Sequence, residues 1–183
     1  ALAIHKYKFP GKKILDFLFY IPVVIPDIII GVSLLALYGW LHITLGLQTV
    51  IPGHVAITTS YVMFVVLARL HGFDQSLEEA ARDLGANPWQ AFWKVVFPLI
   101  FPGILAGALL SFTISLDEFV ISFFTSGPGS NPLPVLIYSM VRKGVSPEIN
   151  ALSTILILVI IIMVLVVGAR MGQGRGQKEA NDG

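Results

Sequence analysis

The sequence predicts an all-α protein that crosses a membrane several times, and its composition and long apolar stretches carry this prediction. Hydrophobic residues make up 55% of the chain and charged residues only 13%, and the mean hydropathy is +0.81. A soluble domain carries about a quarter charged residues, so this excess of apolar surface indicates a bilayer as the solvent. Helices are expected there, because backbone polar groups in lipid must find partners within the segment.

Four stretches are long enough to cross a hydrocarbon layer of about 30 Å, which takes about 20 helical residues. We expect these spans at residues 14–40, 54–70, 95–124 and 150–167. Pro22 and Pro26 each remove a backbone hydrogen bond from the first span, which predicts a kinked helix. The fourth span contains the apolar run Ile155–Val167, which is too long for a barrel strand and lacks its polar alternation.

The basic residues predict how the four spans are oriented. Ten of the 12 Lys and Arg residues lie before the first span, between the second and third, or after the fourth, and only Arg142 and Lys143 lie on the other side. The positive-inside rule therefore places both visible termini and the loop at 71–94 in the cytoplasm. Residues 125–149 form a turn-rich segment outside, and the Gly- and charge-rich tail at 168–183 is predicted to be disordered.

Several classes of function are disfavoured by the same sequence. The net charge of +1 argues against a nucleic-acid partner, and the absence of cysteine excludes disulfides and thiolate chemistry. The four histidines lack the spacing of metal ligands, so no metal site is expected. The chain lacks an initiator Met and its first residues do not form a signal peptide. We expect that a preceding part is missing and that Ala1–Ile4 ends a truncated helix.

The loop at 71–94 carries the most distinctive pattern. Ser76 and Glu79 have the spacing of a capping box, which predicts the start of a helix. Its apolar face is formed by Leu77, Ala80, Ala81 and Leu84. Gly85 suits the left-handed position that ends a helix, and Asn87-Pro88 would start a second one. That second helix is amphipathic through Trp89, Phe92, Trp93 and Val96. On these patterns alone, the pair could also be a hairpin lying among lipid headgroups.

The exact residues of this loop resemble the EAA loop of ABC importer permeases. Glu79-Ala80-Ala81 is followed by Gly85 and then by Val95-x-Phe97-Pro98, where the family pattern has Ile, Leu and Pro. The resemblance implies the type I importer permease fold, with six transmembrane helices of which four are visible here. It also implies that the loop docks into a groove of a cytoplasmic ATPase. The residues implied in this coupling are Leu77, Glu79, Ala80, Ala81, Leu84, Gly85 and Pro98.

Nothing in the chain resembles a phosphate-binding G-x-x-x-x-G-K-[ST] loop. ATP hydrolysis, with its Mg²⁺, is therefore expected on a partner ATPase. This subunit is expected to be neither an enzyme nor the holder of a cofactor.

Further stretches are similar to the permeases of spermidine and putrescine importers. They are Tyr7–Lys12, Ile25–Asp27, Leu116–Phe119, Leu133-Pro134 and Ile149–Thr154. This resemblance implies a multi-pass protein of the bacterial inner membrane that forms half of the path for a polyamine. The implied partners are a dimer of the ABC ATPase, a second homologous permease and an extracytoplasmic polyamine-binding protein, besides the lipid bilayer.

Besides Asp16 near the start of the first span, three acids lie deeper in the predicted spans, where each charge costs about 2.5–3.5 kcal/mol at the bilayer centre. Asp27 lies near the middle of the first span, and Asp117 and Glu118 lie in the outer half of the third. At about 100° per residue, one face of the third span collects Ser111, Ser115, Glu118 and Ser122. These residues are candidates for an acidic, water-lined path for a cation. Alternatively, the acids pair with the partner permease or stay protonated.

A polyamine carries several ammonium groups, which spaced carboxylates and aromatic faces would complement. Trp40 and Tyr138 are candidate aromatic contacts near the outer surface, although ordinary residues of the interfacial belt have the same placement. Another small solute, such as ferric ion or an organophosphonate, is the alternative substrate. Two other classes remain open, namely a membrane scaffold that does not transport and a proton-coupled carrier that uses the acids as relays.

Overall fold

The computed structural model describes residues 1–74, 76–144 and 147–179. Every regular element in these ranges is a helix, which confirms the predicted all-α class. The helices are α1 (Leu2–Lys6), α2 (Lys12–Val24), α3 (Asp27–Trp40), α4 (Leu47–His71), α5 (Ser76–Asp83), α6 (Pro88–Ala91), a π-helical turn η1 (Phe92–Val96), α7 (Phe97–Asp117), α8 (Phe119–Thr125), α9 (Leu133–Lys143) and α10 (Pro147–Glu179).

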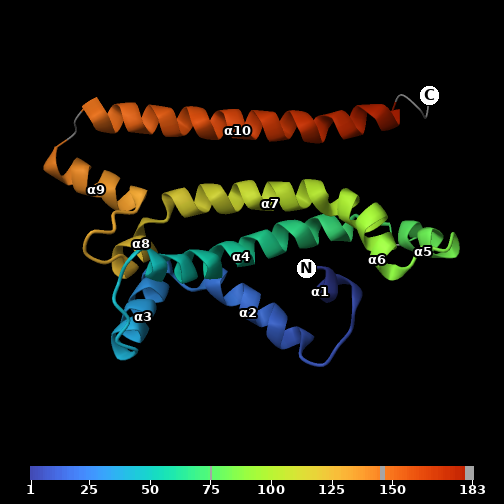
Figure 1. The fold of residues 1–183 in the computed structure, drawn as a ribbon, viewed down its shortest axis with the longest axis horizontal. Helices are drawn as coiled ribbons and strands as arrows, with labels where there is room; N and C mark the ends of the chain where they lie inside the picture. The colour runs from blue at the N-terminus through green and yellow to red at the C-terminus, as the bar shows by residue number, and fades with distance from the viewer. Residues whose placement is uncertain (75, 145–146, 180–183) are drawn as a thin grey trace.

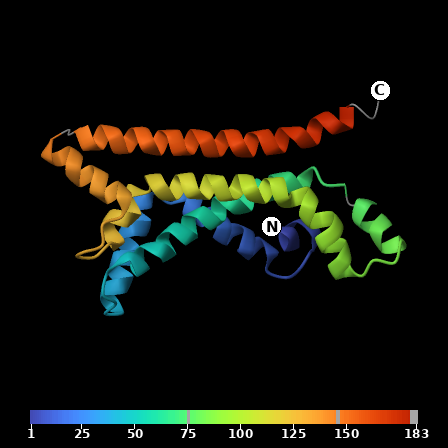
Figure 2. The same ribbon diagram turned by 45° about the horizontal axis from the view of Figure 1, so that its top comes forward.

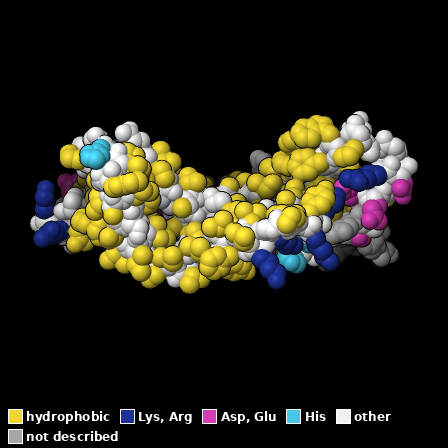
Figure 3. All heavy atoms as spheres, turned by 90° about the horizontal axis from the view of Figure 1, so that it is seen from below, with side chains coloured by type: hydrophobic (Ala, Val, Ile, Leu, Met, Phe, Trp, Pro, Cys, Tyr) yellow, Lys and Arg dark blue, Asp and Glu magenta, His cyan; other side chains and the backbone are white. Residues whose placement is uncertain are grey.

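Two long helices, α4 and α7, lie side by side and form the centre of the molecule (Figure 1). The helices α3, α8 and α9 gather at one end, which we call the α8 end, and α1, α5 and α6 gather at the other, the α5 end (Figures 1 and 2). From the α8 end, α2 runs back along α4, and α10 extends along α7 with little contact. Figure 3 shows charged side chains concentrated at the two ends, with a largely hydrophobic surface between them.

Three helical stretches are long and apolar enough to cross a membrane, namely Leu47–His71, Pro88–Asp117 and Pro147–Val166. A fourth crossing is formed if α2 and α3 are counted together, although they meet at an angle of 106°. The kink expected in the span at 14–40 is therefore a complete break into two helices. Ile25 has the extended backbone that a following proline favours, and Pro26 then begins the new direction. Pro22, by contrast, lies inside α2.

The predicted third span differs from the structure at both of its ends. The expected second amphipathic helix of the loop is not separate, because α6 passes through η1 directly into α7. The expected continuous helix to residue 124 is interrupted at Glu118, whose ψ of 86° is not helical. The last part becomes the short helix α8, which turns away from α7.

The chain end also differs from the expectation of a disordered tail at 168–183, because α10 continues as a helix to Glu179. The helix needs no new nucleus there, because the apolar run before residue 168 is already helical and each further residue extends it by one backbone hydrogen bond. Residues 180–183 of the predicted tail lie outside the described ranges.

At the α8 end, the helices approach one another unusually closely. Ile121, Ser122 and Thr125 of α8 are fully buried. A Cβ atom on Gly53 of α4 would lie 2.4 Å from the Ile121 side chain, and one on Gly31 of α3 would lie 3.0 Å from Phe124. Small residues at helix contacts allow the backbones to pack closely, which is the main source of helix association in lipid.

Gly53→Ala is expected to destabilise the protein, because the new methyl group would collide with Ile121. Overpacking of this kind costs about 1–3 kcal/mol. Gly39→Ala is the matched control, since Gly39 also lies in a helix but a Cβ there meets nothing within 4 Å. Thermal unfolding of the purified protein in detergent compares the two. Equal stability of both variants would contradict the close packing of α8 on α4.

Candidate functional site

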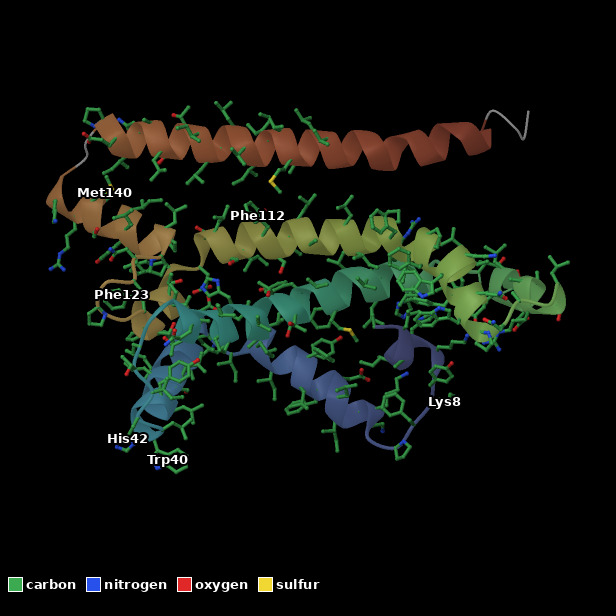
Figure 4. The ribbon with its side chains drawn as sticks, in the orientation of Figure 1. Lys8, Trp40, His42, Phe112, Phe123 and Met140 are labelled. Atoms are coloured by element: carbon green, nitrogen blue, oxygen red, sulfur yellow. The ribbon has the colours of Figure 1, made fainter. Side chains whose placement is uncertain are left out.

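A groove of about 790 Å³ lies between α4 and α7 and reaches the segment that begins α9. Its walls are mostly apolar, and Phe112 of α7 is one of the residues that line it (Figure 4). The polar groups in the groove come from three helices and are His54, Thr58, Ser111, Ser115 and Ser122. A mainly apolar cleft with a few convergent polar groups is the common form of a small-molecule site.

His54 holds the centre of this polar set. Its Nδ1 atom lies 2.8 Å from the Ser115 hydroxyl and its Nε2 atom lies 2.9 Å from the Ser122 hydroxyl. A neutral imidazole donates through one nitrogen and accepts through the other, so one serine accepts a hydrogen bond and the other donates one. A single side chain of α4 thereby connects α7 with α8 across the break at Glu118.

The sequence did not single out His54 among the four histidines, which lack the spacing of metal ligands. It also placed Ser111, Ser115, Glu118 and Ser122 on one continuous helix face, and this is wrong because the helix breaks at Glu118. Ser115 and Ser122 still converge, because both turn toward His54. The Glu118 carboxylate instead accepts a hydrogen bond of 2.9 Å from the Ile121 amide and caps α8.

The three acids of the spans lie at helix breaks. Asp27 is exposed and is the first residue of α3, just after the 106° bend. Asp117 is exposed at the end of α7, and Glu118 follows it with a half-buried side chain. The charges of Asp27 and Asp117 both act on the Glu118 carboxylate. Among the described residues, neither ion pair of the protein involves these acids, and none of the three lines the groove.

The two predicted aromatic contacts are not brought to the groove. Trp40 is 74% exposed at the tip of α3, where it and His42 project away from the other helices (Figure 4). Tyr138 of α9 is half exposed, and its ring packs against Phe119 with a centroid distance of 4.7 Å. Of the predicted residues of the substrate path, the serines Ser111, Ser115 and Ser122 line the groove, whereas the acids and the two aromatic residues do not.

The second region of interest is the loop between α4 and α7, at the α5 end. Gly85 adopts the left-handed conformation, with a φ of +87°. The Ala86 amide donates to the Ala81 carbonyl at 3.0 Å and the Gly85 amide donates to the Arg82 carbonyl at 2.9 Å. These two bonds form the Schellman motif that ends α5, as the position of the glycine predicts.

Both helices of the loop are capped by side chains. Asn87 and Gln90 form a reciprocal capping box at the start of α6, with bonds of 2.8 and 3.1 Å. The Asp74 carboxylate accepts a hydrogen bond of 2.9 Å from the Ser76 amide. Ser76 itself is the first residue of α5 and not its cap. Hydrogen bonds from the Ser76 side chain and amide lower the pKa of Asp74, which favours a negative charge at this helix start.

The surface of α5 is left open to solvent. Leu84 is 89% exposed and Leu77 is 46% exposed. Glu79 and Ala80 are exposed, Ala81 is partly buried, and Pro98 is exposed at the start of α7. A short helix with an uncovered apolar side, held by a defined bend, has the form of a docking element.

Within the described ranges, no group of three His, Cys, Asp or Glu residues is placed to hold a metal ion. His54 uses both ring nitrogens in its bonds to the serines.

Comparison with known proteins gives a consistent result. The family model described as binding-protein-dependent transport system inner membrane component matches residues 1–172. The chain is 42% identical over 157 residues to the spermidine/putrescine transport system permease protein PotC of Haemophilus influenzae, covering 86% of this chain and 61% of that protein. It is 42% identical over 157 residues to the putrescine transport system permease protein PotI of Escherichia coli, covering 82% and 56%.

The molybdenum transport system permease protein ModB of Escherichia coli is 33% identical over 150 residues, covering 73% of this chain and 66% of that protein. The chain thus spans about three fifths of the length of the two polyamine permeases.

His54→Ala is expected to lower the free energy of unfolding by about 1–3 kcal/mol, because two hydroxyls in the groove lose their partner. Thr58→Val is the matched control, since the Thr58 hydroxyl lines the same groove but bonds only to the His54 carbonyl in its own helix. Thermal unfolding in detergent measures both. Equal losses would show that the histidine does not connect the helices.

Proposed function

The chain belongs to the family of inner membrane components of binding-protein-dependent transport systems, and from this premise we propose that it is the permease subunit of an ABC importer for polyamines such as spermidine and putrescine. The type I permease fold and a multi-pass placement in the membrane follow from the family and from the apolar helices. The observation that carries the proposed substrate is the 42% identity to two permeases named for polyamines, over more than four fifths of this chain.

The loop α5–α6 is the proposed contact with a dimer of the ATPase. Leu77, Glu79, Ala80, Ala81 and Leu84 would sit in a groove of that partner, and Gly85 would set the bend. Because α6, η1 and α7 form one continuous helical path, a displacement of α5 would be passed directly into the membrane. ATP and Mg²⁺ would be used by the partner. The loop would face the cytoplasm with both visible termini, so the α8 end would face outward.

The α8 end is the proposed site of the substrate path. Irregular backbone is tolerated at membrane depth only where protein or water surrounds it, and both helix breaks carry acids that are exposed in the single chain. Asp27, Asp117 and Glu118 would attract the ammonium groups of a polyamine. Ser115 would contribute to the neighbouring groove, and Trp40 and Tyr138 would act nearer the outer surface.

The complete importer would contain a second homologous permease and an extracytoplasmic polyamine-binding protein. A pair of permeases would enclose the exposed acids between them, which a single chain leaves open. The family match favours transport over a scaffold that does not transport and over a proton-coupled carrier.

Gly85→Val is expected to abolish ATP-coupled uptake of labelled spermidine in proteoliposomes while leaving membrane insertion intact. A β-branched residue in the left-handed region costs about 1–3 kcal/mol, and a Cβ at Gly85 would meet nothing within 4 Å, so the effect would come from the backbone alone. Gly85→Asn is the control, because asparagine tolerates this conformation. Normal uptake in the valine variant would refute the proposed role of the bend.

Single neutralisation of the three acids tests the substrate path. Asp27→Asn and Asp117→Asn are each expected to raise the KM for spermidine by about tenfold, the effect of losing about 1.4 kcal/mol of attraction. Glu118→Gln should lower uptake further, since the side chain also caps α8. Asp16→Asn is the control, because Asp16 lies in a different pocket, lined by residues of α1, α2 and α4. If none of the three variants differs from this control, the cation path is wrong.

A further inference from the structure

Glu78, the residue before the Glu-Ala-Ala motif, connects two segments that are far apart in the sequence. Its carboxylate forms an ion pair with Lys6 of α1 and a second one, of 3.1 Å, with Arg82 of its own helix. The side chain of Glu78 is only 13% exposed, although α5 as a whole is open to solvent. Lys6 lies 72 residues earlier in the chain, so this contact connects the loop to the segment before the first span.

The two ion pairs of Glu78 connect different parts of the protein. Arg82 follows Glu78 by one helical turn, so their pair stabilises α5 itself. Lys6 is the member of the pair that reaches another element. Removing the charge of Lys6 would therefore leave α5 folded and release only its tie to α1.

An apolar cluster lies at the same end of the molecule and explains why α1 is a firm attachment point. Val66 and Leu70 of α4 are buried against Val96 of η1 and Ile100 of α7. Leu2 of α1 and Phe73, just after α4, pack on this cluster from outside. The α5 helix rests on η1. The segment that offers Lys6 is thus packed on the same core that supports the loop.

We infer that Glu78 is a positioning residue, which ties α5 to α1 through Lys6 so that both move as one body when α5 is displaced. A displacement of α5 then enters the membrane part at two places, through η1 into α7 and through α1 onto α4. This inference rests on the proposed function, since it names a second route for the motion that the partner ATPase would impose. Glu79 differs from Glu78 in being exposed, and neither ion pair of Glu78 includes it.

A cross-linking experiment in the assembled importer tests the tie. The chain has no cysteine, so Lys6→Cys with Glu78→Cys places a unique pair of thiols in it. The partner subunits are used in cysteine-free form, and a short bifunctional thiol reagent joins the pair in proteoliposomes. Without the reagent, we expect the spermidine taken up per ATP hydrolysed to fall by about two- to five-fold, as expected for a partly exposed ion pair. With the reagent, the ratio should return to that of the unmodified importer.

Two results of this experiment would overturn the inference. A cross-link that stops transport would mean that α1 and α5 must separate during the cycle. A double-cysteine variant that keeps full coupling before cross-linking would mean that the ion pair has no role.

A double-mutant cycle distinguishes the tie from unrelated effects of the two charges. Lys6→Met should lower coupling, and the double variant should lose no more coupling than Glu78→Gln alone, because the Lys6 charge has no partner to lose once Glu78 is neutral. Lys6→Arg should retain coupling. Lys8→Met and Asp83→Asn are matched controls, which remove an exposed charge from the α1–α2 connection and from α5. Losses that add in the double variant would refute the pairing.

Failure of the proposed substrate can be recognised separately. An unmodified importer that hydrolyses ATP but takes up no spermidine would contradict the polyamine assignment. The yield of cross-linking would still test the contact between α1 and α5. The Lys6→Cys, Glu78→Cys pair should cross-link in higher yield than a Lys8→Cys, Glu78→Cys pair, and equal yields would overturn the inference.

Discussion

The close approach of α8 to α3 and α4 is the contact on which the α8 end depends. In lipid there is no water to expel from between helices, so a seven-residue helix gains its hold from close packing and from hydrogen bonds. Gly31 and Gly53 provide the room for Ile121 and Phe124. The Thr49 hydroxyl donates to the Thr125 carbonyl at 2.7 Å, and the Tyr38 hydroxyl donates to the Thr49 carbonyl at 3.0 Å. With α8 fixed in this way, Ser122 faces His54.

Breaking a helix at membrane depth exposes backbone groups that need partners, and the protein supplies them locally. Glu118 ends α7 and caps α8 at once, so the residue that interrupts the helix also stabilises the next one. His54 then connects the two pieces from α4. The same arrangement places carboxylates at the two helix breaks. Capping and a polar lining for a cation are therefore compatible uses of the same residues.

The features that the sequence predicted well are those with a local physical cause. Long apolar runs predicted the spans, and Gly85 together with the helix start at Asn87-Pro88 predicted the bend of the loop. The 106° turn at Pro26 was expected only as a kink, because a proline shows that a helix is disturbed but not where its continuation packs. The polar face drawn through Glu118 assumed an unbroken helix. His54 was missed because its partners lie 61 and 68 residues away, and no periodicity within α4 indicates which helix will lie beside it.

The π-helical turn η1 has a consequence for the direction in which α5 faces. The Phe97 amide donates to the Phe92 carbonyl, five residues back. Pro98, just beyond, has no amide to donate, and its ring would conflict with the carbonyl four residues before it in a regular helix. The wider turn accommodates one extra residue, which advances the helix by about 100° relative to an uninterrupted one. The direction in which α5 lies around the axis of α7 is thus a property of one turn of backbone, set by Pro98, which lacks an amide hydrogen.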